Sequence, residues 1–246
     1  MKAIILCAGY ATRLYPLTEN FPKPLLPISN KPLLEHIIEK INEIPVNEII
    51  IISNHKLINH FKRWREDFQT NLSLKILDDG STSEENKLGA LKDLSFALEK
   101  EKIDEDFLVV ARDNIHKFSF SDFHNKFKKL NNNLIAVHDM QDLEKVRKKY
   151  GVVLLDKNEK VINFQEKPEN PKSTMKSICC YLFKPIIKPL LLQYLQSNNP
   201  DATGYFVEWL IKQKPVYAFQ FSEPVYDVGN LESYEEVKKN FDKDEY

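Results

Sequence analysis

The sequence predicts an α/β protein in which helices cover both faces of a mixed, mostly parallel central sheet. In the first half of the chain, short apolar runs of strand length alternate with segments whose apolar residues recur at helical spacing. This alternation is typical of an open parallel sheet with connecting helices on both faces. Farther along, a strand that starts at 150–153 is followed by a turn at 156–159 and a return strand at 161–165. This pattern predicts a small antiparallel extension around 151–183.

The individual elements follow from the same patterns. Residues 33–44 carry apolar side chains at helical spacing, and the unbroken isoleucine run at 49–52 predicts a buried strand. By the same reasoning we expect strands at 3–6, 48–53, 74–77, 107–111, 134–138, 177–183, 216–221 and 225–228. We expect helices at 33–44, 57–64, 90–98, 120–130 (starting near Ser121 or Asp122), 186–195 and 231–240, and one within 198–213.

The composition excludes several classes of protein. The 246 residues can bury a substantial core, and 35 basic and 36 acidic residues give a net charge of −1. This balance argues against nucleic acid or an anionic membrane as the main partner. Cys7, Cys179 and Cys180 form neither a metal-ligand spacing nor a disulfide framework, which favours a reducing compartment. No apolar run approaches the ~18 residues of a membrane span, so we expect a cytoplasmic protein with no membrane partner.

The loop after the first strand predicts phosphate binding. Residues 3–6 form the strand, and the chain then enters a polar loop at Gly9 that carries Thr12, Arg13 and Lys23. Small residues let backbone N–H groups approach an anion closely, an arginine clamps phosphate oxygens in pairs, and a lysine adds a compact charge.

Residues 1–27 resemble the signature loop of the sugar-phosphate nucleotidyltransferases, whose common form is close to LAGGxGTRLxPLTxxxPKPLLP. The residues that match it are Arg13, Pro16, Leu17, Thr18, Pro22, Lys23 and Pro24. Ala8 and Ala11 stand where many members have glycine, and a positive φ at either position would be penalised. The resemblance is to the catalytic domains of glucose-1-phosphate thymidylyl- and uridylyltransferases, and it implies a Rossmann-like, three-layer nucleotidyltransferase fold.

The resemblance extends along nearly the whole chain. It implies one catalytic domain at 1–246, with a nucleotide-binding part at about 1–140 and an acceptor-binding part at about 141–240. It also implies that the partners are an NTP and a small phosphorylated acceptor, and it leaves a homo-oligomer open.

The resemblance assigns the nucleotide to two segments. The implied contacts are Leu6, Ala8, Gly9, Ala11, Thr12, Glu84, Asn86 and Gly89. Gly89 opens a helix similar to the family's GxxxA segment, which packs beneath the base. A carboxylate at Glu84 or Glu85 would accept from the amine of cytosine or from guanine, whereas Asn86 would pair with uracil or thymine. A solvated acidic loop is the alternative for these residues, so the base stays open.

Two aspartates at strand ends are candidate ligands for Mg²⁺. Arg112-Asp113-Asn114 resembles the family's GDN motif with an arginine in place of glycine, and Tyr226-Asp227-Val228-Gly229 resembles its WxDxG ending. A carboxylate after a strand is often only a helix N-cap, but hard cations prefer such oxygens. The resemblance implies that Asp113 and Asp227 hold Mg²⁺ together. Arg112 contacts a phosphate or crowds the site if it points inward, and is solvated if it points outward.

The second half of the chain carries the implied acceptor site. Glu166-Lys167-Pro168 resembles the family's EKP motif, in which the glutamate holds sugar hydroxyls and the lysine holds the acceptor phosphate. Gly151 belongs to the YGVV segment that precedes this motif. The resemblance also assigns Cys179 to the acceptor site, at a position where relatives commonly have glycine, and we expect its side chain to behave as a buried, small apolar group rather than in redox chemistry.

The implied reaction is transfer of a nucleotidyl group from an NTP to a sugar 1-phosphate with release of pyrophosphate. Arg13 would stabilise the leaving pyrophosphate and Lys23 the α-phosphate, while Mg²⁺ is the cofactor. One alternative is a cytidylyltransferase that acts on phosphocholine or another small phosphate. Another is a catalytically weak protein that binds nucleotide sugars or regulates. A glycosyltransferase is disfavoured because Arg112-Asp113-Asn114 supplies no DxD motif.

Overall fold

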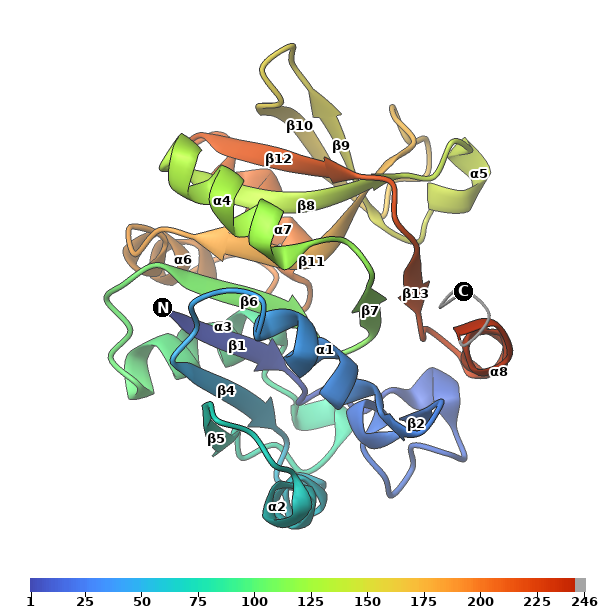
Figure 1. Ribbon diagram of the computed structural model, residues 1–246. Coiled ribbons are helices and arrows are strands. Elements are labelled where there is room, and N and C mark those ends of the chain that lie inside the picture. Colours follow the sequence, from blue (N-terminus) through green and yellow to red (C-terminus); the bar gives the residue numbers. More distant parts are fainter. Residues whose placement is uncertain (242–246) are drawn as a thin grey trace.

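The computed structural model describes residues 1–241, which form an α/β fold of three layers (Figure 1). Within these residues, a mixed sheet of nine strands runs through the middle and helices cover both of its faces. The fold class expected from the sequence is confirmed. Residues 242–246 of the expected domain lie outside the described residues.

The parallel part of the sheet positions the loop after the first strand. It consists of β1 (Lys2–Leu6), β4 (Glu48–Ser53), β5 (Ser73–Asp78) and β6 (Phe107–Ala111), in the order β5-β4-β1-β6. Ile4 of β1 pairs with Ile50 of β4 on one side and with Val109 of β6 on the other. Because these strands point the same way, the loops that follow them meet at one edge of the sheet, where ligands of open α/β sheets bind.

The strand β11 (Met175–Phe183) joins this parallel part to the rest of the sheet. Its residues 180–183 pair antiparallel with β6 and its residues 176–177 with β9 (Gly151–Leu155), while its other edge pairs with β8 (Asn133–Asp139). The outer strands are β12 (Val216–Phe221), parallel to β8, and β10 (Val161–Glu166), antiparallel to β9. The hairpin of β9 and β10 is the expected antiparallel extension, seen at the top of Figure 1.

The two faces of the sheet carry different helices. One face packs against α3 (Ala90–Lys100), α6 (Ile187–Leu195) and α7 (Thr203–Leu210), and the other against α1 (Leu33–Ile41), α2 (Ile58–Asp67), α4 (Phe120–Leu130) and α8 (Leu231–Asn240). Successive side chains of a strand point to opposite faces. Accordingly, Ile4 and Leu6 of β1 belong to the core on the α3 side, and Ala3 and Ile5 belong to the core on the α1 side.

A short antiparallel ribbon beside the sheet brings the two conspicuous aspartates together. It consists of β7 (Asn114–His116) and β13 (Val225–Asp227), and β12 leads into β13 as the chain approaches α8 (Figure 1). Asp227 pairs with Asn114, and the backbone N–H of Val228 donates to the carbonyl of Asp113 at 2.9 Å. Asp113 and Asp227 are therefore neighbours, as expected.

Several expected elements differ from the structure in their bounds. The helix expected at 33–44 ends at Ile41, and the strand expected at 177–183 begins at Met175. The α4 helix has the expected bounds, and its cap is Ser119, whose side chain accepts from Asp122 N at 3.1 Å. The sequence patterns did not predict four short elements, which are β2 (Pro27–Ile28), β3 (Lys31–Pro32), β7 and α5 (Leu143–Val146).

Candidate functional site

A polar cleft of about 870 Å³ opens at the carboxyl ends of β1 and β6. All the site residues expected from the sequence line it except Lys23 and Asn86. The expected residues in its wall are Leu6, Ala8, Gly9, Ala11, Thr12, Arg13, Glu84, Gly89, Asp113, Gly151, Glu166, Lys167, Cys179 and Asp227. The fold thus gathers segments of the chain that lie far apart in sequence into one cleft of nucleotide size.

The loop after β1 is held in place by polar contacts to its backbone. The side chain of Asn54 donates to the carbonyl of Ala8 at 2.8 Å, and the hydroxyl of Thr18 donates to the carbonyl of Ala11 at 2.8 Å. Ala11 has φ 52° and ψ 42°, which is left-handed backbone. The penalty expected for a positive φ at an alanine therefore applies at Ala11, where the side chain adds backbone strain.

Two arginines contribute positive charge to the same wall of the cleft. Arg13 is exposed, and its guanidinium forms no ion pair with another described residue. Arg112 points inward, and its guanidinium lies against Gly9 so closely that a Cβ on Gly9 would be 2.3 Å from one of its nitrogens. Gly9 thus allows this close approach, and a side chain there would force the guanidinium of Arg112 to shift. The Nε atom of Arg112 is buried without a hydrogen-bond partner among the described residues.

Each candidate metal ligand is paired with a buried lysine. Lys23 Nζ lies 3.2 Å from Asp113 Oδ2, and Lys176 Nζ lies 3.7 Å from Asp227 Oδ2. Burial lowers the pKa of Lys23 and of Lys176, and the facing aspartates oppose that shift. Burial alone would raise the pKa of Asp113, but Lys23 and Arg112 outweigh it and hold this pKa below its usual range. Asp113 is therefore an ionised carboxylate at neutral pH.

This donor set fits Mg²⁺ that arrives with a nucleotide. Mg²⁺ is usually held by one or two carboxylates together with substrate phosphates and waters, rather than by a complete protein cage. Asp113 and Asp227 supply two neighbouring carboxylates. In the described part of the chain, no group of three or more histidine, cysteine, aspartate or glutamate side chains forms a fuller metal site.

The acceptor end of the cleft is built around Glu166. Its side chain is only 8% exposed and lies in a slot between two glycines. A Cβ on Gly204 would be 1.8 Å from Glu166 Oε2, and a Cβ on Gly151 would be 3.1 Å from the same atom. Burial raises the pKa of Glu166, with Lys167 opposing and Glu208 adding to the shift. Lys167 itself is about half exposed, with Nζ 4.0 Å from Glu166 Oε1.

Cys179 lines the same end of the cleft. Burial raises the pKa of its thiol to about 12, and the hydroxyl of Thr203 donates to the sulfur at 3.3 Å. The thiol is therefore protonated and unreactive, in agreement with the inert role expected of it.

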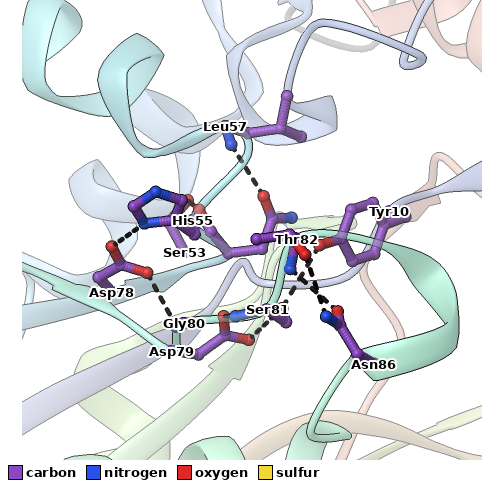
Figure 2. Close-up of polar contacts among 11 residues, drawn as sticks. Tyr10, Ser53, His55, Leu57, Asp78, Asp79, Gly80, Ser81, Thr82 and Asn86 are labelled. Atoms are coloured by element: carbon purple, nitrogen blue, oxygen red, sulfur yellow. Dashed lines mark hydrogen bonds and ion pairs between the residues drawn. The ribbon is translucent and has the colours of Figure 1, made fainter.

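The loop between β5 and α3 places its two expected base contacts differently. Glu84 lines the cleft, but Asn86 does not. The Asn86 carbonyl oxygen accepts from the backbone N–H groups of Thr82 and Ser83 at 2.9 Å, and its amide nitrogen donates to the Thr82 hydroxyl at 3.0 Å (Figure 2). The side chain of Asn86 thus closes its own short helical turn.

Several residues in the cleft were not singled out by the sequence patterns. They are Tyr10, Asp79, Asp93, Tyr150, Lys176 and Gly204. Two of them could have been identified from the sequence, because each is a charged residue among apolar residues. Asp93 is a charged residue among the buried apolar residues of α3, and Lys176 is a charged residue within an otherwise apolar strand. A charge on a buried face is rare unless it is paired or functional.

The fold and the cleft together define a class of protein, an α/β nucleotide-binding protein with a phosphate loop and a paired-carboxylate centre. The chain belongs to the nucleotidyl transferase family, whose sequence profile matches residues 2–244. No helix of the described residues is long and apolar enough to cross a membrane.

Two relatives illustrate the sequence similarity. The chain is 32% identical over 232 residues to the bifunctional protein GlmU of Methanocaldococcus jannaschii, a match that covers 93% of this chain and 51% of that protein. It is 33% identical over 175 residues to the probable mannose-1-phosphate guanylyltransferase 1 of Oryza sativa subsp. japonica, covering 69% of this chain and 46% of that protein. The chain thus spans about half the length of these relatives.

Solved structures share the fold at lower sequence identity. A UDP-glucose pyrophosphorylase complexed with UDP-glucose superposes with a TM-score of 0.85 at 22% identity, over 99% of this chain and 98% of that one. A putative glucose-1-phosphate thymidylyltransferase from Bacillus anthracis gives 0.81 at 21% identity, over 97% and 94%.

Proposed function

We propose that this protein transfers a nucleotidyl group from an NTP to a sugar 1-phosphate in a reaction that depends on Mg²⁺. The observation that carries the proposal is the cleft itself. It places the arginine-bearing phosphate loop, the Asp113 and Asp227 pair, and the Glu166 and Lys167 pair around one space. Family membership and the names of the relatives agree with this reaction.

The chemistry needs positioning and charge neutralisation rather than a covalent enzyme intermediate. An oxygen of the acceptor phosphate attacks the α-phosphorus, a new P–O bond forms, and the bond between the α-phosphorus and the bridging oxygen breaks. Pyrophosphate leaves with the bonding electrons. Because both reactants are polyanions, the protein's main task is to hold them in line against their mutual repulsion.

The residues divide this task between the two ends of the cleft. Arg13 binds the departing pyrophosphate, and Lys23 stabilises charge at the α-phosphate from behind Asp113. Asp113 and Asp227 hold Mg²⁺, which when bound neutralises phosphate charge. At the other end, Lys167 binds the acceptor phosphate and Glu166 accepts hydrogen bonds from sugar hydroxyls.

The test is pyrophosphate release in the presence of Mg²⁺. ATP, CTP, GTP, UTP and dTTP are each combined with a panel of sugar 1-phosphates and with phosphocholine. We expect release only when one nucleotide and one sugar 1-phosphate are present together. Asp227→Asn should abolish most of this release while leaving the melting temperature nearly unchanged, because Asp227 is partly exposed and the amide oxygen of asparagine still offers an acceptor to the buried Lys176.

Other outcomes would replace the proposal by a named alternative. Release with CTP and phosphocholine would identify a cytidylyltransferase of small phosphates. Nucleotide binding without release across the whole panel would identify a binding or regulatory protein.

A further inference from the structure

Asp93 is an unusual residue to find in the wall of a polyanion-binding cleft. It lies in the first turn of α3 and is only 5% exposed, yet it lines the cleft. Its Oδ1 atom has no hydrogen-bond partner among the described residues. A buried, unpartnered carboxyl oxygen is costly, so its presence at a binding site points to a donor supplied by a ligand.

A second carboxylate, Asp79, faces the same part of the cleft and is held rigidly. Its Oδ1 atom accepts from the backbone N–H and the hydroxyl of Ser81, both at 2.7 Å (Figure 2). Its own backbone N–H donates to the carbonyl of Ser53 at 3.0 Å, and the hydroxyl of Tyr10 donates to that of Ser81 at 3.4 Å. Asp79 therefore presents a fixed carboxylate rather than a mobile surface group.

The two carboxyl groups share one proton near neutral pH. Burial raises the pKa of Asp93 to about 8, and the neighbouring charge of Asp79 adds to the shift, while Arg112 opposes it. A protonated Asp93 donates its proton to Asp79, as expected for two carboxyl groups in contact. A carboxylate offers about four acceptor positions. Ser81 fills two of those on Asp79 and the shared proton fills a third, so one remains open, together with Oδ1 of Asp93.

Asp79 lies across the cleft from Asp113. Asp79 follows β5, which is separated from β6 and Asp113 by β4 and β1. Three strand spacings amount to roughly 14 Å, which is about the distance from an α-phosphate to the far edge of a base and longer than the distance to the ribose. Two small residues, Gly89 and Ala90, also line the cleft.

We propose that Asp79 and Asp93 recognise the base of the nucleotide and that the base is guanine. This inference rests on the proposed nucleotidyl transfer. Guanine presents two adjacent donors, the N1–H and the N2 amine, which match the two open acceptors. Cytosine and adenine present one amine beside an acceptor nitrogen. Uracil and thymine present one N–H flanked by two carbonyl oxygens, which the carboxyl oxygens would repel.

The experiment measures binding of GTP, ATP, CTP, UTP and dTTP with Mg²⁺ by calorimetry, and pyrophosphate release with the same nucleotides. We expect GTP to bind at least roughly tenfold more tightly than UTP or dTTP, the discrimination of one good bidentate contact. Asp79→Asn turns an amide donor toward the base, so it should abolish the preference for GTP. Asp93→Ala should do the same, whereas Asp93→Asn should retain it, because its amide donates to Asp79 as the protonated acid does.

Asp78→Asn is the matched control. Asp78 precedes Asp79 in sequence, but its carboxylate binds His55 at 2.7 Å and the backbone N–H of Gly80 at 2.9 Å, and it does not line the cleft (Figure 2). This variant should leave the GTP preference unchanged.

The outcomes separate this inference from the proposed function. Turnover that prefers UTP, dTTP, CTP or ATP would leave the transferase standing and overturn guanine recognition. An unchanged GTP preference in Asp79→Asn would overturn the role of the pair. If no nucleotide binds at all, both the proposed function and this inference are wrong.

Discussion

Ala11, in the phosphate loop, has a backbone conformation that is unfavourable for alanine. Its left-handed backbone would suit glycine, because a Cβ there crowds the following carbonyl oxygen. The sequence pattern identified this position through the alanine that replaces the family's glycine. Only the structure could separate it from Ala8, which also replaces a glycine but does not have a positive φ.

We expect Ala11→Gly to raise the free energy of unfolding by about 0.5–1 kcal/mol, because relief of the left-handed strain exceeds the entropy that glycine adds to the unfolded chain. The matched control is Ala8→Gly, which should lower the free energy of unfolding, since Ala8 is buried and gains nothing in backbone strain. Urea unfolding of the two variants measures both changes. A loss of stability in Ala11→Gly would mean that the left-handed backbone carries no strain.

The shared proton of Asp93 predicts a dependence of stability on pH. The pKa of Asp93 is raised from 3.8 to about 8 in the folded protein, chiefly by burial, so the folded state binds a proton that the unfolded state has lost. Stability from this group therefore falls as pH rises between about 4 and 8, by up to ~1.4 kcal/mol per pH unit.

The difference in unfolding free energy between the wild type and Asp93→Asn isolates this slope. Other titrating groups, such as His116, whose pKa burial lowers to about 3, cancel in the difference. We expect the wild type to lose stability relative to the variant from pH 5 to pH 8. Parallel curves would show that Asp93 is ionised throughout.

At the scale of elements, the start of α7 controls the position of Glu166. Gly204 was not found from the sequence because a glycine near a helix start is common, and its packing partner on β10 is far away in the chain. We expect Gly204→Ala to displace Glu166 and to raise the KM for the acceptor at least roughly tenfold, because sugar hydroxyls lose a fixed acceptor.

The KM for the nucleotide is the internal control for Gly204→Ala, because the atoms nearest to the added Cβ belong to Glu166 and Phe164 and not to the phosphate loop. Alanine also favours the helix by about 1 kcal/mol, so the variant should remain folded. Unchanged acceptor kinetics would show that Glu166 tolerates the displacement or does not contact the acceptor.

The strand β11 carries a second residue that predicts a kinetic effect. Lys176 is 4% exposed, lies over the ring of Tyr150 at 3.7 Å from its centroid, and faces Asp227. Under the proposed function, Mg²⁺ held by Asp227 would compete with Lys176 for that carboxylate, and the ammonium group would then be available to the phosphates. We expect Lys176→Met to reduce kcat about 100-fold, the usual effect of removing one charge-stabilising donor. Lys176→Arg should retain more activity, and equal losses in both would assign a packing role to Lys176.

The sequence predicted most elements but not the shortest or the ends of some. Residues 48–53, 107–111, 120–130, 216–221 and 231–240 have the expected bounds, because each combines a strong apolar pattern with clear breaks at its ends. The ribbon of β7 and β13 depends on pairing between segments about a hundred residues apart, so no local pattern marks β7. Likewise, β11 begins before its apolar run and includes the buried Lys176, which is paired with Asp227.

On the scale of the whole molecule, some residues of the candidate site could be identified from the sequence and others could not. Motif residues such as Arg13 and Asp113 were identifiable because they occur at fixed spacing in a known pattern. Asp79 and Asp93 were not, because their proximity arises only when α3 packs beside the end of β5. The structure therefore adds the Asp79 and Asp93 pair to the cleft, and we infer from it which nucleotide is used.

The continuous sheet also predicts that the whole chain unfolds in a single transition. The chain has two tryptophans, of which Trp64 lies in α2 and Trp209 lies in α7. The Trp64→Phe variant leaves Trp209 as its fluorescent reporter, in the expected acceptor-binding part. The Trp209→Phe variant leaves Trp64, in the expected nucleotide-binding part. Because β11 pairs with strands of both parts, the two reporters should report transitions of equal cooperativity, each coincident with circular dichroism of the same variant. A reporter transition that departs from the dichroism would reveal two separately unfolding parts.

The pairing of β11 has one more consequence, for how substrates enter. This strand hydrogen-bonds to β6 and β8, which belong to the expected nucleotide-binding part, and to β9, which belongs to the expected acceptor-binding part. Hinge bending between the two parts would have to break these backbone hydrogen bonds, so we do not expect the two parts to open and close by a hinge motion. Substrate capture and product escape must instead be governed by the loops and long side chains at the rim, and turnover should be insensitive to solvent viscosity beyond its effect on diffusion.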